Sequence, residues 1–253
     1  MQRLFAEPFQ IDEEHHCIFI TGDDVNHIKN VLRMKPGEEV WVSDSRNKEY
    51  HCTIQNLDRD EVRLQILYVQ ETDYELPGKI CLFQALPKGD KMELIVQKAV
   101  ELGAAEIIPV ETKRCVVKLD AKKREKKTAR WQEIARSAAK QSKRMLVPKV
   151  QPVMTFSEAL AYAQELDVCL IPYELARGMK ETKKILEEIR PGETIGIFIG
   201  PEGGFEEEEV DKAMKMGAKP ITLGRRILRT ETAGLTLLSV LMFHLEEENG
   251  SIF

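Results

Sequence analysis

The sequence has few cysteines, no paired metal-ligand motif and no long hydrophobic run. Its five cysteines are dispersed among 253 residues without a C-x-x-C pair, which argues against a disulfide framework and against a zinc site. The longest charge-free apolar run near the C-terminus, residues 234–243, is far shorter than the roughly 20 residues that span a bilayer. The first ten residues lack the apolar core of a signal peptide. We therefore expect a cytoplasmic protein with reduced thiols, no membrane segment and, because its histidines are scattered, no metal site.

Charge is distributed unevenly along the chain. Apolar residues make up 43% and charged residues 31% of the sequence, and the net charge is −5, a mixture that is typical of globular proteins. Residues 113–149 contain 14 Lys and Arg against three acidic residues, a local charge of +11 that leaves −16 for the remainder. A basic segment in an otherwise acidic protein predicts one surface that faces a polyanion.

The hydrophobic pattern changes near residues 74–78. Before this point, residues 39–44, 49–57 and 61–69 have the period-two alternation of half-buried strands. Residues 23–34 have helical spacing that puts Val25, Ile28, Val31 and Leu32 on one face. After residues 74–78, short apolar runs alternate with helical segments, which predicts a mostly parallel sheet. These apolar runs are residues 80–86, 106–110, 167–173, 194–200 and 220–224. We expect a small β-barrel at residues 1–73 and an α/β domain at residues 74–253.

Two helix boundaries are suggested by local signals. Asp90 and Glu93 have the D-x-x-E spacing of a capping box, and Gly103 follows the apolar positions of that helix. The final helix is expected from about Glu231 to Glu247.

The stretch IGPEGGFEEEEV, residues 199–210, has the layout of a phosphate loop: an apolar strand, glycines and a helix start. It lacks the Lys-Ser/Thr pair of a Walker loop and the G-x-G-x-x-G spacing of a dinucleotide fingerprint. Six acidic residues and no basic residue lie between Glu202 and Asp211, so the segment would repel a triphosphate. The pattern alone favours a structural turn whose glutamates complement the helix dipole. A site for a phosphate-free ligand at the end of the strand stays open.

A second segment, LGRRILRTETAGL at residues 223–235, favours the ligand site over the structural turn. Together with IGPEGGF and with SAAKQSKRMLVPKV at residues 137–150, it resembles bacterial 16S ribosomal RNA uridine-N3 methyltransferases. These belong to the knotted (SPOUT) superfamily of S-adenosylmethionine-dependent RNA methyltransferases. The resemblance extends to RLF at residues 3–5, HIKNVLRMKPGE at residues 27–38 and KGDKMELIVQKAVELG at residues 88–103. It therefore covers nearly the whole chain. The combination of GPEGG with LRTETA is specific, whereas each half alone is weak.

The resemblance implies a trefoil knot in the C-terminal α/β domain, a PUA-like RNA-binding barrel at residues 1–73 and a homodimer. It implies 16S rRNA or the small ribosomal subunit as substrate and S-adenosylmethionine as cofactor, held by loops 170–173, 199–204 and 218–230. The expected cofactor-binding residues are Leu170, Pro172, Ile199, Gly200, Pro201, Glu202, Gly203, Gly204, Leu223, Gly224, Ile227, Leu228 and Thr230.

The chemistry implied is an in-line methyl transfer to N3 of uridine. Arg229 is expected to stabilise negative charge on the uracil oxygens, and Glu231 to accept the N3 proton or hold Arg229. Thr230 also suits the N-cap of the final helix. Glu202 is the one carboxylate expected near the cationic cofactor, because the glutamates at 206–209 are expected to be solvated at the helix start.

The basic segment supplies the expected RNA contacts. Residues 128–145 are interpreted as one helix with an apolar face and a cationic face, although a lone charged helix is often only a solvated surface. The residues expected to position RNA are Arg33, Arg136, Lys140, Gln141, Lys143 and Arg144. Because N3 lies on the Watson–Crick edge, the target uridine must be unpaired or flipped out.

Three other functions stay open. Ribose 2′-O methylation of rRNA or tRNA would use the same fold. A non-catalytic RNA-binding or ribosome-assembly factor could retain it. An α/β nucleotide hydrolase is disfavoured by the acidic loop and by the missing Lys-Ser/Thr pair.

Overall fold

The computed structural model describes residues 2–72, 74–173 and 178–247, which divide into two compact units that are treated separately below. Unit 1 contains Met1–Glu75 and Ala139–Val147, and unit 2 contains Leu76–Ala138 and Pro148–Phe253. The sequence places a single boundary between residues 73 and 74, whereas the structure also assigns Ala139–Val147 to unit 1. No helix among the described residues is both long enough and apolar enough to cross a membrane.

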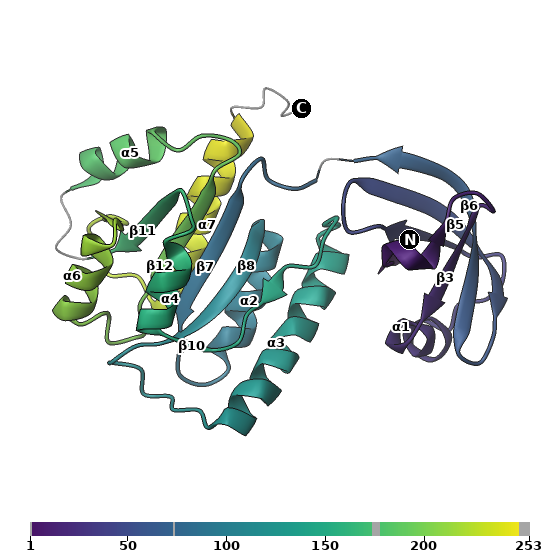
Figure 1. Ribbon diagram of the computed structural model, residues 1–253, viewed down its shortest axis with the longest axis horizontal. Coiled ribbons are helices and arrows are strands. Elements are labelled where there is room, and N and C mark those ends of the chain that lie inside the picture. The colour runs from purple at the N-terminus through teal and green to yellow at the C-terminus, as the bar shows by residue number, and fades with distance from the viewer. Residues whose placement is uncertain (1, 73, 174–177, 248–253) are drawn as a thin grey trace. The chain divides into compact units, whose positions relative to one another are not determined.

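Unit 1 is built on a six-stranded sheet in the order β1-β4-β5-β6-β3-β2. Its strands are β1 (Gln2–Phe5), β2 (Ile11–Asp12), β3 (Cys17–Thr21), β4 (Glu39–Ser43), β5 (Lys48–Leu57) and β6 (Glu61–Glu71). All neighbours pair antiparallel except β1 and β4, and the sheet curls in Figure 1. The alternation expected in β5 and β6 is confirmed, because Tyr50, Cys52, Ile54, Val62, Leu64 and Ile66 all lie in one buried core. A 3-10 turn, Pro8–Gln10, follows β1.

The helical segment of unit 1 departs from the expected amphipathic helix. It consists of α1 (Asp23–Asn26) and a π-helical turn at His27–Val31. In this turn, the amide of Leu32 donates to the carbonyl of His27 at 2.9 Å, five residues back. A π turn widens the helix and so rotates Val31 off the apolar face. Val25 and Ile28 are buried as expected, but the expectation for Val31 is wrong, because it is 62% exposed.

Unit 2 contains a seven-stranded, all-parallel sheet. Its strands are β7 (Lys79–Ala85), β8 (Ala104–Glu111), β9 (Lys149–Val150), β10 (Met154–Thr155), β11 (Val168–Pro172), β12 (Thr194–Ile199) and β13 (Lys219–Ile221). The order is β10-β8-β7-β12-β11-β13, with β9 also paired to β8. β12 lies between β7 and β11 and is almost entirely buried, as expected of an apolar run in the middle of a parallel sheet.

Helices cover both faces of this sheet (Figure 1). On one face, α7 (Thr230–Glu247) packs against α2 (Lys91–Glu101), β7 and β12. On the other, α4 (Phe156–Ala163) and α6 (Glu207–Lys215) share a core with Phe83 and Phe198, whose rings stack at 4.3 Å. The remaining helices are α3 (Ala121–Gln141) and α5 (Met179–Glu187). The predicted α/β class with a parallel sheet is confirmed, and a knot within it stays a prediction.

One expected helix boundary is wrong, because α3 ends at Gln141, and Lys143 has a φ of +60°, which no helix interior accommodates. The start expected at Asp90 is confirmed, since Asp90 is the N-cap of α2. The expected capping box is not formed, because Asp90 makes no side-chain capping bond and Glu93 pairs with Arg130.

Candidate active site

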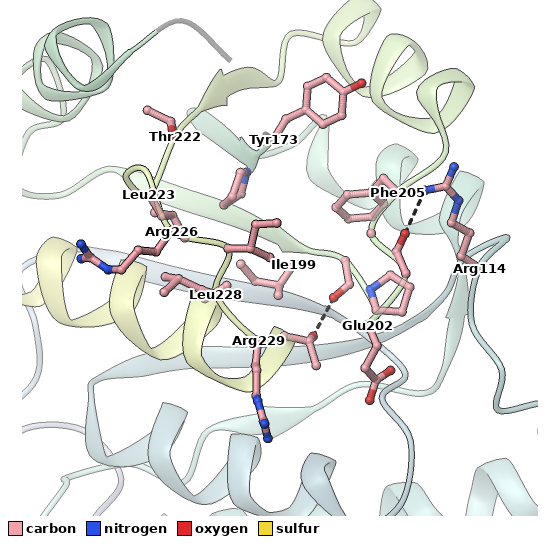
Figure 2. Close-up of a pocket in the computed structure, with 18 of the residues that line it drawn as sticks. Arg114, Tyr173, Ile199, Glu202, Phe205, Thr222, Leu223, Arg226, Leu228 and Arg229 are labelled. Atoms are coloured by element: carbon pink, nitrogen blue, oxygen red, sulfur yellow. Dashed lines mark hydrogen bonds between the residues drawn. The ribbon is translucent and has the colours of Figure 1, made fainter. Parts of the chain in front are cut away.

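A cavity of about 820 Å³ opens at the carboxyl ends of the strands of unit 2 (Figure 2). Three segments form most of its wall: the end of β11, the glycine loop after β12, and the loop at residues 222–230 before α7. Lys91 of α2 and Arg114, which follows β8, complete it. This volume is within the range of small-molecule sites, and the carboxyl edge of a parallel sheet is where such sites form.

The cavity brings together most of the residues that the resemblance implies. The expected cofactor residues that line it are Pro172, Ile199, Gly200, Pro201, Glu202, Gly203, Gly204, Leu223, Gly224, Ile227, Leu228 and Thr230. Leu170 does not line it, because its side chain is fully buried within the sheet. Arg229 lines the cavity. Glu231 is not among the lining residues, although it contacts Lys91, which is. Sequence reasoning did not single out Lys91, Arg114, Phe205, Thr222, Arg225, Arg226 or Ala233.

The glycine loop folds back tightly on itself. The amide of Gly204 donates to the carbonyl of Pro201 at 2.9 Å, and Gly204 has a φ of +67°, which favours glycine. A Cβ on Gly200 would lie 3.3 Å from the backbone of Gly204, closer than an ordinary contact. These two positions therefore need glycine, and the loop presents backbone to the cavity.

Thr230 ties this loop to α7. Its buried hydroxyl donates to the carbonyl of Gly200 at 2.6 Å and accepts from Nε2 of Gln84 at 2.9 Å. The interpretation of Thr230 as an N-cap is wrong, because Thr230 is already the first residue of the helix. The hydroxyl instead connects β7, the glycine loop and α7 at the floor of the site.

Lys91 bridges two carboxylates beside the cavity. Its Nζ lies 2.9 Å from Oε1 of Glu202 and 3.4 Å from Oε2 of Glu231, and the amide of Lys88 also donates to Glu202. Burial opposes ionisation of Glu202, but the hydrogen bond and charge of Lys91, together with backbone hydrogen bonds that include the one from Lys88, outweigh it and lower the pKa of Glu202 from its usual value.

The orientation of Glu202 changes one expectation. Figure 2 shows its carboxylate turned away from Ile199 and Tyr173. Because this charge is paired with Lys91, the structure does not support Glu202 as the carboxylate that faces a cationic cofactor. Glu231 contacts Lys91, and no ion pair with Arg229 occurs among the described residues.

The acidic start of α6 anchors the segment after β8. Glu206 pairs with Arg114 at 2.9 Å, and Arg114 also donates to the carbonyl of Gly203 at 2.8 Å. The hydrogen bond from Arg114 holds the pKa of Glu206 below its usual value. Glu209 is buried, accepts from the amide of Lys113 at 2.9 Å and completes a capping box with Glu206. The expectation that all four glutamates are solvated is therefore wrong for Glu209, whereas Glu206 stays partly exposed although it is paired with Arg114.

The loop at residues 222–230 carries exposed cations. Arg225, Arg226 and Arg229 are exposed, and the described residues provide no ion pair for any of them. Figure 2 shows Arg226 and Arg229 extending outward from the loop, and Leu223 and Leu228 of the same loop line the cavity and are only partly exposed. Ile227 is 91% exposed.

Six of the 14 cations of the basic segment at 113–149 form ion pairs with acids from other elements. The pairs are Lys113–Glu208, Arg114–Glu206, Arg124–Glu111, Arg130–Glu93, Lys140–Asp24 and Arg144–Glu75. The expectation that Arg144 faces RNA is wrong in this structure, because Arg144 is 5% exposed and is bound by Glu75. Of the other expected RNA contacts, Arg33, Arg136, Gln141 and Lys143 are exposed, and Lys140 is half-buried against Asp24.

No cluster of three or more potential metal-ligating side chains occurs in the part of the chain that the structure describes. The site therefore consists of backbone, apolar side chains, paired carboxylates and exposed arginines.

The parallel α/β sheet with a glycine-loop cavity, accompanied by a small curled sheet, defines a two-domain methyltransferase that acts on RNA. Residues 74–242 match the family model of the RNA methyltransferase domain, and residues 20–67 match that of the RNA methyltransferase PUA domain. The chain belongs to this RNA methyltransferase family.

Named relatives cover almost the whole chain. Ribosomal RNA small subunit methyltransferase E of Bacillus subtilis is 40% identical over 97% of this chain and 98% of its own length. The protein of the same name from Neisseria gonorrhoeae, solved bound to S-adenosyl methionine, is 34% identical with a TM-score of 0.81, covering 96% of this chain and 97% of that one. A methyltransferase from Legionella pneumophila, solved with bound SAM, is 32% identical with a TM-score of 0.81, covering 95% and 96%. The resemblance to the methyltransferase family and the expected PUA domain are confirmed.

Proposed function

We propose that this protein transfers the methyl group of S-adenosylmethionine to N3 of a uridine in the 16S rRNA of the small ribosomal subunit. The observation that carries the proposal is the cavity, which combines the glycine loop with the 222–230 loop. Relatives that share the fold over nearly the full chain were solved with this cofactor. The names of the relatives support small-subunit rRNA as the substrate.

The residues of the cavity fit this cofactor. Ile199, Leu223 and Leu228 supply an apolar lining, and Gly200 and Gly204 supply backbone that a side chain would otherwise cover. The loop offers neither the lysine nor the Ser/Thr that a nucleotide phosphate requires. S-adenosylmethionine has no phosphate, so the acidic start of α6 does not oppose its binding.

The chain's own side chains support attack by uridine N3. When bound, S-adenosylmethionine supplies an electrophilic methyl group. Loss of the N3 proton leaves negative charge on the uracil ring and its oxygens, and we assign the stabilisation of this charge to the guanidinium of Arg229, an exposed residue of the cavity wall. Glu231, held by Lys91 at 3.4 Å, is the carboxylate that we assign as proton acceptor.

We also propose that the protein is a homodimer that acts in the bacterial cytoplasm, where ribosomal subunits are assembled. Val240 and Phe243 are 43% and 59% exposed on α7 and lie three residues apart, so they share one helix face. An apolar face on the helix that follows the cavity supports contact with a second copy.

The test is mass spectrometry of nucleosides from small subunits of a strain that lacks the gene, after incubation with the protein and labelled cofactor. We expect 3-methyluridine at one position. A 2′-O-methylated nucleoside would instead identify a ribose methyltransferase, and the absence of label would support a non-catalytic binding role.

Arg229→Ala tests the assigned chemistry. We expect kcat to fall by roughly 10²–10³-fold, the usual loss for one charge-stabilising donor, with cofactor affinity retained in calorimetry. Arg190→Ala, an exposed arginine of unit 2 outside the cavity, is the matched control and should retain full activity. Retained turnover in Arg229→Ala would exclude the role given to Arg229.

A further inference from the structure

We propose that Arg225 and Arg226 form a phosphate-binding rim over which the substrate RNA strand enters the cavity. This inference rests on the proposed function, and it names the surface that holds the backbone of the RNA on either side of the target uridine. The two arginines belong to the loop between β13 and α7 and line the mouth of the cavity.

The first observation is the absence of compensating charge around this loop. Residues 218–230 contain four basic and no acidic residues. Arg225 and Arg226 are exposed, and the described residues offer no carboxylate within ion-pair distance of either. By contrast, Arg114, Arg124 and Arg130 are each held by a glutamate. An unpaired guanidinium is a planar, bidentate donor that suits a phosphodiester.

The second observation is the direction in which the loop presents its side chains. Gly224 has a φ of +114°, a backbone conformation that L-residues avoid, and Arg225 and Arg226 follow this turn directly. Leu223 and Leu228 line the cavity and are less exposed than Arg225 and Arg226, and Arg226 extends away from Ile199 (Figure 2). The loop thus combines partly buried apolar side chains with exposed cations.

The third observation concerns the basic segment at residues 113–149, the other surface that could bind RNA. The sequence places the largest basic excess at residues 113–149, but six of the 14 cations there form ion pairs with acids from other elements, including Arg130 with Glu93 and Lys140 with Asp24. Pairing reduces the field that would attract an RNA strand. The loop at 222–230 retains its charge, and it lies where the target base must be placed.

The chemistry of the target favours an RNA backbone over a free anion. N3 is accessible only in an unpaired or flipped nucleotide, so the flanking phosphates must be held while the base enters the cavity. Ile227, 91% exposed next to Arg226, adds an apolar surface for a ribose or a base. A lone anion would use the arginines but not Ile227.

The experiment uses the full-length protein with Arg225→Ala and Arg226→Ala combined, and small subunits from a deletion strain as substrate. We expect KM for subunits to rise roughly tenfold, with kcat changed less than about twofold, because phosphate contacts position the strand without joining the reaction. The slope of log affinity against log salt should fall by about 1.4, since each contact to single-stranded RNA contributes about 0.7. Cofactor affinity, measured by calorimetry, should remain within about twofold of wild type.

A charge-matched control is Lys122→Ala combined with Lys126→Ala on α3, where both lysines are exposed. We expect KM and the salt slope of this control to match those of wild type. A variant with Arg225→Lys and Arg226→Lys should keep most of the wild-type salt slope, and its KM should rise less than that of the double alanine variant. Lysine returns the charge without the bidentate geometry of arginine.

Three outcomes would overturn the inference. The first is a KM and a salt slope that stay unchanged in the variant with Arg225→Ala and Arg226→Ala. The second is a larger rise in KM in the control with Lys122→Ala and Lys126→Ala. The third is a loss of cofactor affinity in the Arg225→Ala, Arg226→Ala variant, which would assign the loop to the cofactor instead. Failure of the proposed function is distinguishable, because wild type would then transfer no methyl group to subunits at all.

Discussion

Replacing Thr230 with valine tests the connection between the glycine loop and α7. Valine has nearly the same shape, so Thr230→Val removes the hydroxyl with little change in packing. It deletes the 2.6 Å bond to the carbonyl of Gly200 and the 2.9 Å bond from Gln84. A buried polar group left without its partner costs about 1–3 kcal/mol. The amide of Gln84 keeps its hydrogen bond to the carbonyl of Ala85, so the cost of losing its bond to Thr230 lies at the lower end of this range.

We therefore expect Thr230→Val to lower the free energy of unfolding of unit 2 by about 2–4 kcal/mol. For a domain of this size, this corresponds to a fall in Tm of roughly 5–15 °C. Because Gly200 is no longer held against α7, the affinity for S-adenosylmethionine should also fall by roughly tenfold, which is about 1.4 kcal/mol.

Calorimetric melting and cofactor titration measure both effects. Thr232→Val is the control, since Thr232 is exposed two residues later on the same helix, and it should stay within about 0.5 kcal/mol of wild type. Thr230→Ser should recover much of the loss by restoring the hydroxyl. A Thr230→Val protein that melts within about 2 °C of wild type and binds cofactor normally would refute the assigned connection.

Three further changes can be measured on the same site. Lys91→Met leaves Glu202 and Glu231 without their amine, and because ion pairs that are partly exposed contribute little to stability we expect only a small fall in Tm in thermal melts at neutral pH. Gly224→Ala forces a φ of +114° on a residue with a Cβ, and should cost about 1–2 kcal/mol and lower cofactor affinity in calorimetry. The pKa of Glu202 is below its unfolded value of 4.5, so its pairing with Lys91 stabilises the fold above pH 4.5 and is lost as the pH falls through the folded pKa. Tm should accordingly decline less steeply in Lys91→Met than in wild type as the pH is lowered from 5 toward 3.

Much of the fold follows from local pattern. The apolar run at 194–199 predicts a buried parallel strand, and β12 is that strand. Likewise β5 and β6 follow from strict alternation. Strands β1 and β2 could not be predicted in this way, because β1 has four residues and β2 has only two residues. Segments this short are defined by their pairing partners rather than by their own sequence.

The site could be predicted only where its residues lie in contiguous motifs. Gly200, Gly204 and Arg229 belong to the two quoted segments and line the cavity. Lys91 and Arg114 lie about a hundred residues away in sequence, and only the parallel sheet brings them to the same edge. A lysine in the first turn of a helix carries no signal of its own, since it is not placed to favour the helix dipole and has no nearby partner in sequence.

Charge counted along the sequence differs from the charge that the fold leaves unpaired. Six of the 14 cations of residues 113–149 pair with acids from other elements. The acidic start of α6 supplies two of these acids, through Glu206 with Arg114 and Glu208 with Lys113. The two features that appear separate in sequence, a basic segment and an acidic helix start, therefore compensate each other in the fold. What attracts a polyanion is the charge that remains unpaired, and at the cavity this charge is carried by the loop at residues 222–230.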